Sequence, residues 1–251
     1  MSQGRERQKV KRQISEGIKE FEFHSVKKRS TFSKAELDRS QVELTARQTE
    51  LYKGIRNNTL TVAHGPAGTS KTFTTCYTAL ALLADKKIEK IIITKPVQES
   101  GENLGALPGT IDEKIDPYKQ SYYTTFCKII GKPQTEFLFS TEEIIFEPLA
   151  YMRGSTYDNC VMLLDECQNA TLKQLMLWST RLGQDSKAIM MGDTSQYDLR
   201  KRDSGYLTFI KMVEGMESLF LFEFKNEDIV RNKFLIELTK RYDKWRADNN
   251  D

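Results

Sequence analysis

The chain has 251 residues, a formal net charge of only +3, and a composition that is 39% hydrophobic and 29% charged. Such a chain is long enough to bury one substantial core, and its weak net charge argues against strong binding of polyanions by the whole molecule. No apolar run approaches membrane-spanning length, and residues 1–20 lack the apolar region of a secretory signal. The four cysteines form no C-x-x-C pair. We therefore expect reduced thiols and a cytoplasmic protein with no membrane partner.

A basic segment lies near the N-terminus of the chain. Residues 5–29 hold nine lysines and arginines against four glutamates. We expect residues 1–40 to form a basic N-terminal extension that is partly flexible. The extension is either an arm that contacts nucleic acid or a solvated tail, and the charge pattern leaves both interpretations open.

Short apolar runs alternate with helical patterns along the rest of the chain. The apolar runs predict strands at residues 58–63, 90–94, 160–164, 188–191 and 219–224. The helical patterns cover residues 45–56, 71–84, 172–182, 205–214 and 229–246. Continuous apolar runs are typical of strands that are buried on both faces of a parallel sheet. The sequence therefore predicts an α/β fold, a mainly parallel sheet with helices on both faces and ligands at the carboxyl ends of the strands.

The stretch 97–157 interrupts this alternation. It contains Pro108, Pro117, Pro133 and Pro148 between short helical patterns, and we expect it to be an insertion between the second and third core strands. Its aromatic residues either pack a helix or stack on nucleic-acid bases. These residues are Tyr118, Tyr122, Tyr123 and Phe126.

One short segment carries the pattern of a phosphate-binding loop. It lies between the first strand and the helix at 71–84, and consists of Gly65, Pro66, Ala67, Gly68, Thr69, Ser70, Lys71 and Thr72. Backbone N–H groups of such a loop surround phosphate oxygens, and the following helix points its positive end at them. By this pattern Lys71 contacts the β- and γ-phosphates, and the Thr72 hydroxyl binds Mg²⁺. The alternative is a plain turn rich in glycine and proline.

Ser70 departs from the usual pattern G-x-x-x-x-G-K-[ST], in which a glycine precedes the lysine. A serine keeps the N–H donor but adds a Cβ atom. That atom is tolerated where the backbone is right-handed and costly where φ is positive, and the sequence leaves the conformation open.

Polar residues follow two further strands. Asp165 and Glu166 come directly after the strand 160–164, and Gln196 follows the strand 188–191 in the string Gly-Asp-Thr-Ser-Gln. Asp165 is a candidate Mg²⁺ ligand, directly or through water, and Glu166 a candidate base for the attacking water. Gln196 is a candidate sensor of the γ-phosphate. Acidic pairs at strand ends are common, so the site is indicated by the order of all three motifs along the chain and not by this pair alone.

The D-E-x-Q and G-D-x-x-Q strings resemble the core of superfamily 1 helicases, and longer strings resemble the PhoH family of phosphate-starvation-inducible ATPases. The resemblance covers about residues 42–240. The strings that carry it are residues 65–72, 94–96, 99–109, 114–118, 152–154, 164–169, 180–183, 192–196 and 228–231.

The resemblance implies a single RecA-like P-loop NTPase domain over residues 41–251 that binds ATP and Mg²⁺. It also implies a homo-oligomer, for which a hexameric ring is a candidate form. It makes Gln48 a candidate adenine contact, because a carboxamide pairs with both N6 and N7. An exposed polar helix residue is the alternative at that position. Lys95 and Cys167 stand where the family usually has arginine and alanine, and the lysine lacks the planar fork that binds phosphate.

An arginine from a neighbouring subunit accelerates phosphoryl transfer in related enzymes by about 10³–10⁵. Arg153, Arg181 and Arg231 lie in family-like strings, and Arg231 is favoured because it opens the last helical pattern. A structural salt bridge is the alternative role of each.

The resemblance thus implies an ATP-hydrolysing protein coupled to RNA or single-stranded nucleic acid as an oligomeric helicase-like motor. The alternative is a nucleotide-gated module that binds nucleic acid or protein with little or no turnover. A small-molecule kinase is disfavoured, because the sequence shows no arginine-rich lid and contains the string at 192–196.

Overall fold

A parallel sheet organises the fold. The computed structural model describes residues 32–96, 111–193, 204–230 and 233–249. Within these ranges the sheet has six strands in the order β3-β2-β4-β5-β1-β6, and each neighbouring pair is parallel. The strands span Leu60–His64 (β1), Lys90–Thr94 (β2), Ile144–Phe146 (β3), Cys160–Leu164 (β4), Lys187–Gly192 (β5) and Leu219–Glu223 (β6). The predicted α/β fold with a mainly parallel sheet is confirmed.

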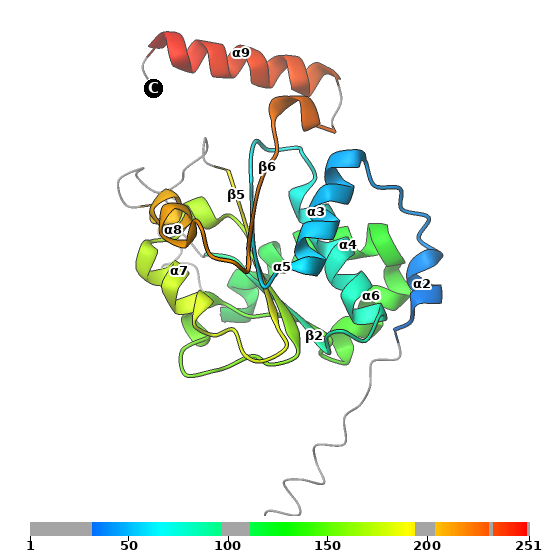
Figure 1. Cartoon of the computed structure of the whole chain (residues 1–251). Coiled ribbons are helices and arrows are strands. Elements are labelled where there is room, and N and C mark those ends of the chain that lie inside the picture. Colours follow the sequence, from blue (N-terminus) through cyan, green and yellow to red (C-terminus); the bar gives the residue numbers. More distant parts are fainter. Residues whose placement is uncertain (1–31, 97–110, 194–203, 231–232, 250–251) are drawn as a thin grey trace, which may run out of the picture. The chain divides into compact units, whose positions relative to one another are not determined.

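Helices lie on both sides of this sheet (Figure 1). The α-helices span Lys34–Asp38 (α2), Ala46–Asn57 (α3), Lys71–Ala84 (α4), Ile111–Ile130 (α5), Lys132–Ser140 (α6), Leu172–Ser179 (α7), Tyr206–Val213 (α8) and Lys233–Asn249 (α9). Short 3-10 helices span Leu149–Tyr151 (η2), Cys167–Asn169 (η3) and Asn226–Asp228 (η4). Side chains of α2 to α6 pack against one face of the sheet, and side chains of α7 and α8 pack against the other.

The alternation of side chains along each strand builds these two layers. In β4, Val161 and Leu163 enter the core that contains α4 and α5. Met162 and Leu164 enter the core that contains α7 and α8. All four side chains are completely buried. Because successive residues of a strand point to opposite faces, a strand covered on both sides requires a continuous apolar run, which is the pattern that located the strands in the sequence.

The stretch 97–157 adds a strand that the sequence pattern did not reveal. Residues 97–110 lie outside the described residues, and α5, α6 and β3 follow them. β3 pairs in parallel with β2, but its three residues are too few to show a periodicity. Tyr122 and Phe126 of α5 are buried in the core, so in this structure these two aromatics pack a helix and present no face to a nucleic-acid base.

The N-terminal extension predicted for residues 1–40 is described only from residue 32 onward. Phe32 and Leu37 are buried in the same core as α3 and α4. The Ser33 hydroxyl and N–H donate to the Glu36 carboxylate, which caps α2. The basic residues between 5 and 29 lie outside the described residues.

All four cysteines belong to described ranges and are free thiols. Cys76, Cys160 and Cys167 are buried, and Cys127 is partly exposed. Burial raises the pKa of the Cys76 and Cys167 thiols well above the usual value. Separately, none of the helices in the described part of the chain has both the length and the apolar character that crossing a bilayer needs.

Candidate functional site

The predicted motifs converge at the carboxyl edge of three adjacent strands. The phosphate-binding loop follows β1, the pair Asp165–Glu166 follows β4, and Asp193 follows β5, which lies between them. These strand ends surround a cavity of about 330 Å³. The residues that line it are Ala67, Gly68, Ser70, Lys71, Thr72, Phe73, Asp165, Glu166, Gly192, Asp193 and Val230.

The loop itself needs unusual backbone conformations. Gly65 has φ +136°, and a Cβ atom there would lie 2.3 Å from the carbonyl oxygen of Phe224 at the end of β6. Only glycine fits that turn without displacing β6. Ser70 adopts φ 64° and ψ 29°, a left-handed conformation. Of the two alternatives that the sequence left open, the structure therefore has the costly one for this serine.

The charged side chain of the loop lies folded back on it. Lys71 Nζ donates to the carbonyl oxygens of Gly65 at 2.7 Å and Pro66 at 2.9 Å. Helix α4 begins at Lys71, so the first N–H groups of that helix lie at the cavity. An ammonium group and the N-terminus of a helix at one cavity make a site for an anion such as a phosphate.

Oxygen atoms suited to a divalent cation lie beside this anion site. The Thr72 hydroxyl donates to Asp165 Oδ2 over 3.4 Å. Hard oxygen donors of this kind suit Mg²⁺, which is held in proteins by one or two side chains together with phosphates and water. Within the described ranges, no group of three or more histidine, cysteine or acidic side chains could hold a metal by itself. Thr72 and Asp165 thus fit a cation that arrives with a phosphate ligand.

Two further donors, besides the Thr72 hydroxyl, hold the Asp165 carboxylate. Its Oδ1 accepts the N–H of Glu166 at 3.0 Å, and its Oδ2 accepts the hydroxyl of Tyr122 at 2.7 Å. Burial, together with the charge and hydrogen bond of Asp165, raises the pKa of Tyr122 well above its usual value. The phenol is therefore protonated, and stays a donor, at physiological pH.

The Glu166 carboxylate contacts two different neighbours. Oε2 accepts from Gln168 Nε2 at 2.7 Å, and Oε1 lies 3.6 Å from Lys95 Nζ, which follows β2. Gln168 is 2% exposed, and its Oε1 accepts the N–H of Asp193 at 3.0 Å. The side chain of Gln168 therefore joins the ends of β4 and β5. The D-E-x-Q and G-D-x-x-Q strings contain Gln168 and Asp193, but the sequence pattern assigned neither residue a role.

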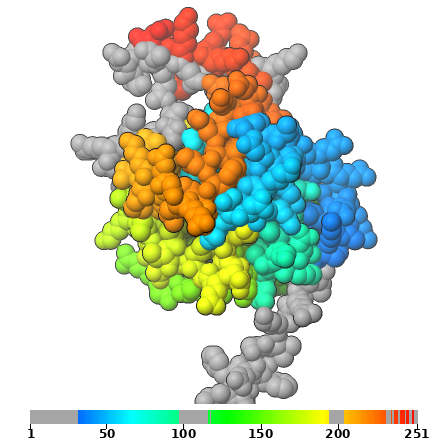
Figure 2. All heavy atoms as spheres, in the orientation of Figure 1, coloured from blue at the N-terminus to red at the C-terminus, as the bar shows by residue number. Residues whose placement is uncertain are grey.

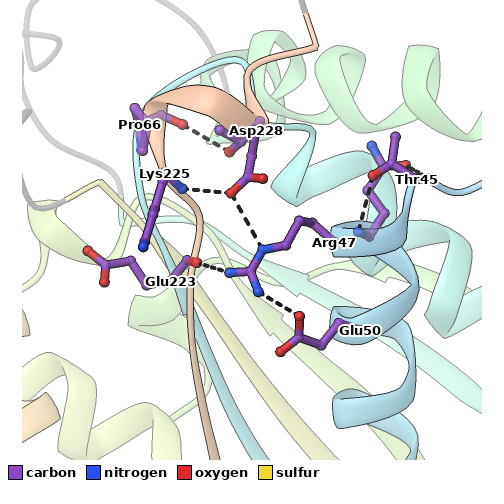
Figure 3. A network of polar contacts seen from close by, with 9 residues as sticks. Thr45, Arg47, Glu50, Pro66, Glu223, Lys225 and Asp228 are labelled. Carbon is purple, nitrogen blue, oxygen red and sulfur yellow. Dashed lines mark hydrogen bonds and ion pairs between the residues drawn. The ribbon is translucent and has the colours of Figure 1, made fainter.

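A cluster around Arg47 lies beside the loop (Figure 3). Arg47 of α3 donates to the carbonyl oxygen of Glu223 and lies 3.6 Å from Asp228 Oδ2, with its guanidinium 4.4 Å from the centre of the Phe222 ring. In the space-filling view, the orange segment of β6 and η4 lies against the blue α3 (Figure 2). Val230 lies two residues after Asp228, and its N–H donates to the carbonyl oxygen of Gly68 in the phosphate-binding loop. Arg47 thus ties α3 to the segment that contacts the loop.

The remaining candidate residues have different positions. Gln48 is buried, and its Oε1 accepts the N–H of Thr45 in a capping box at the start of α3. It does not line the cavity described above, and its contact with adenine stays a prediction. Gln196 and Arg231 lie outside the described residues.

The two other candidate arginines lie elsewhere. Arg181 donates to the backbone oxygens of Leu177 and Ser155, as expected of a structural residue. Arg153 is exposed and lines a separate cavity with Gln174 and Leu177. Neither arginine reaches the phosphate-binding loop within this chain.

Comparison with known proteins identifies relatives that are similar in sequence over most of this chain. A PhoH-like protein of Bacillus subtilis is 40% identical over 201 residues, which cover 80% of this chain and 63% of that protein. The protein PhoH of Escherichia coli is 36% identical over 188 residues, which cover 74% of this chain and 53% of that protein. The chain thus spans between half and two thirds of the length of these relatives. Among solved structures, the chain is similar to the Sulfolobus solfataricus SWI2/SNF2 ATPase core in complex with dsDNA. The two chains are 12% identical and superpose with a TM-score of 0.43, and the match covers 72% of this chain and 45% of that chain.

The strand order and the position of the loop after β1 define the fold as RecA-like, as the sequence resemblance implied. A family model described as PhoH-like protein matches residues 42–243, which is most of the chain. The chain belongs to the PhoH-like protein family.

Proposed function

We propose that this protein binds ATP with Mg²⁺ and hydrolyses it. The observation that carries the proposal is one cavity that contains the phosphate-binding loop on one side and two adjacent carboxylates on the other. The paired carboxylates distinguish this cavity from a site that only binds an anion, because they supply a metal ligand and a base.

Each side chain has a defined part in this proposal. The loop N–H groups and Lys71 bind the phosphates, for which Lys71 leaves the two carbonyl oxygens that it contacts in this structure. Thr72 and Asp165 would hold Mg²⁺, which would supply positive charge next to the transferred phosphoryl group. Glu166 takes the proton of the attacking water, and Gln168 orients Glu166 through its hydrogen bond.

We further propose that hydrolysis is coupled to RNA or single-stranded nucleic acid in a homo-oligomer, as in a helicase-like motor. The resemblance of the D-E-x-Q and G-D-x-x-Q strings to helicase cores supports the coupling. A motor of this class needs two RecA-like modules, and in this proposal a neighbouring subunit supplies a second one beside the module described above. In this arrangement Arg231 acts on the phosphates of the neighbour, Gln196 senses the γ-phosphate and Gln48 contacts adenine.

Two substitutions test ATP hydrolysis. Lys71→Ala removes the cation that contacts the phosphates, and we expect it to lower the rate of phosphate release by about 100-fold or more. Glu166→Gln keeps the shape of the side chain but removes the base. We expect it to bind ATP with nearly unchanged affinity and to lower the rate of phosphate release by about 100-fold or more. Unchanged phosphate release in either purified variant would contradict the proposal.

The coupling to nucleic acid is tested by the ATPase rate with added RNA, single-stranded DNA and duplexes, with the oligomeric mass measured in parallel. Stimulation by a single-stranded polymer in an oligomer supports the motor. An equal rate with and without every polymer would contradict it.

A nucleotide-gated binding module is the second candidate, and the left-handed Ser70 favours it. A strained residue directly before the catalytic lysine is compatible with tight binding and slow turnover. ATP binding without phosphate release, in the presence and absence of each polymer, would favour this candidate over the ATPase.

A further inference from the structure

Helix α5 places a tyrosine against the metal-binding side of the candidate site. Tyr122 is 1% exposed, and its hydroxyl donates to Asp165 Oδ2 at 2.7 Å. The helix belongs to the stretch between β2 and β4 and lies outside the phosphate-binding motifs. Tyr122 was not among the residues that sequence patterns marked as part of the site.

The ring of Tyr122 is fixed by its surroundings. It belongs to the core cluster shared with α4, and it lies 6.4 Å from the Phe146 ring of β3 at an interplanar angle of 60°. A buried ring in such a cluster has little freedom to rotate, so the direction of its hydroxyl is set by packing. Hydrogen bonds to a carboxylate at 2.7 Å are among the strong ones in proteins.

The oxygen that Tyr122 contacts is the one that faces the loop. Asp165 Oδ2 lies 3.4 Å from the Thr72 hydroxyl, while Oδ1 accepts the Glu166 N–H. Without Tyr122, Oδ2 would keep only the long contact to Thr72 among the contacts described here. The Asp165 carboxylate would then keep the Glu166 N–H on Oδ1 and the long Thr72 contact on Oδ2, and its orientation would be fixed less firmly.

Helix α5 is also linked to Glu166, through the side chain of Lys95. The ring of Tyr118, one turn before Tyr122, lies 5.4 Å from Lys95 Nζ, and Lys95 pairs with Glu166 at 3.6 Å. Residues four apart lie on one face of a helix. One face of α5 therefore contacts the Asp165 carboxylate directly and is linked to Glu166 only through Lys95.

We propose that Tyr122 is a positioning residue that holds the Asp165 carboxylate in the orientation needed to bind Mg²⁺ with ATP. This inference rests on the proposed function and adds to it a residue from outside the known motifs. Tyr122 does not contact substrate or metal, and it acts only through Asp165.

The test compares the wild type with Tyr122→Phe, which keeps the ring and removes the hydroxyl. Tyr123→Phe is the matched control, because Tyr123 is the next residue of α5 and its hydroxyl donates to Glu136 instead. Two quantities are measured as a function of Mg²⁺ concentration: the thermal stabilisation by the β,γ-imido analogue of ATP, which is not hydrolysed, and the rate of phosphate release from ATP.

For Tyr122→Phe we expect the Mg²⁺ concentration that gives half of each effect to rise about tenfold, as the loss of one hydrogen bond to a charged group predicts. Saturating Mg²⁺ should restore most of the rate, and stabilisation by the analogue in EDTA should equal that of the wild type. Tyr123→Phe should follow the wild type. Rescue by Mg²⁺ distinguishes positioning of a metal ligand from a general structural defect, which added Mg²⁺ would not repair.

The outcomes separate this inference from the proposed function. If the wild type responds to the analogue and Mg²⁺ but Tyr122→Phe has the same Mg²⁺ dependence as Tyr123→Phe, the inference is wrong and the proposed function stands. A wild type that shows no response to Mg²⁺ and the analogue overturns both. If Tyr122→Phe fails to fold, Tyr122→Leu, which also lacks the hydroxyl, is measured by the same criteria.

Discussion

Ser70 shows how one residue can carry strain inside a binding loop. Its left-handed backbone, at φ 64°, is a conformation in which a Cβ atom costs roughly 1–2 kcal/mol. The following residues Lys71 and Thr72 begin α4, so the strain lies at the junction between loop and helix. A glycine would adopt this conformation without strain but would lose more entropy on folding.

We therefore predict that Ser70→Gly raises the free energy of unfolding by up to about 1 kcal/mol. Urea unfolding of the nucleotide-free protein measures the effect. Ser121→Gly is the control, because Ser121 is an exposed residue in the middle of helix α5 and a glycine there costs about 0.5–1 kcal/mol. A Ser70→Gly protein destabilised as much as Ser121→Gly would show that the left-handed conformation carries no strain.

At the scale of elements, the network around Arg47 connects α3, β6 and η4 (Figure 3). Its contacts with the Glu223 carbonyl, Asp228 and the Phe222 ring join elements far apart in the chain, whereas its pair with Glu50 lies within α3. Exposed pairs within one helix contribute little to stability. The contacts between elements are therefore the ones that matter, since η4 leads to the backbone contact with Gly68.

For Arg47→Ala we predict a loss of about 1–2 kcal/mol of stability and a several-fold weaker affinity for ATP, because η4 would hold the loop less firmly. Urea unfolding and binding of a fluorescent ATP analogue measure the two effects. Arg241→Ala is the control, since Arg241 pairs only with Glu237 within α9 among the contacts described here, and both side chains are exposed. Equal effects of the two substitutions would contradict the role of Arg47.

At the scale of the whole molecule, one partly buried histidine links folding to pH. His64 ends β1, and its pKa is lowered from 6.5, chiefly because burial disfavours the charged ring. Lys71 lowers the pKa further, while Glu223 and Asp193 raise it without reversing the shift. Below pH 6.5 the unfolded chain takes up a proton that the folded protein does not. This contribution to stability is therefore complete above pH 6.5 and is lost as the pH falls toward the folded pKa.

As the pH is lowered from 7 to 5, we predict that the free energy of unfolding falls less in His64→Gln than in the wild type. Urea unfolding at a series of pH values measures it. The sequence has two histidines, so His24→Gln controls for the loss of a histidine in general. The same slope in His64→Gln and the wild type would show that His64 does not produce the decline.

Local patterns in the sequence predicted most of the fold and the core of the site. Buried parallel strands leave continuous apolar runs, and the residues directly after them lie at the ligand-binding edge. The loop at 65–72 and the pair Asp165–Glu166 were located in this way, and the structure brings them to one cavity. Strand β3 was not predicted, because three residues form no recognisable pattern. The role of Gln168 was not predicted either, because it depends on a contact with Asp193 between the ends of two strands.

The sequence by itself determined which residues follow which strands, because that information is local. Only the tertiary structure decided that β5 separates β1 from β4, that Ser70 is left-handed, and that Tyr122 contacts Asp165. Tyr122 and Asp165 are 43 residues apart, and no spacing along the chain specifies a contact of that kind. It exists because α5 packs beside α4 and brings one buried hydroxyl to the end of β4.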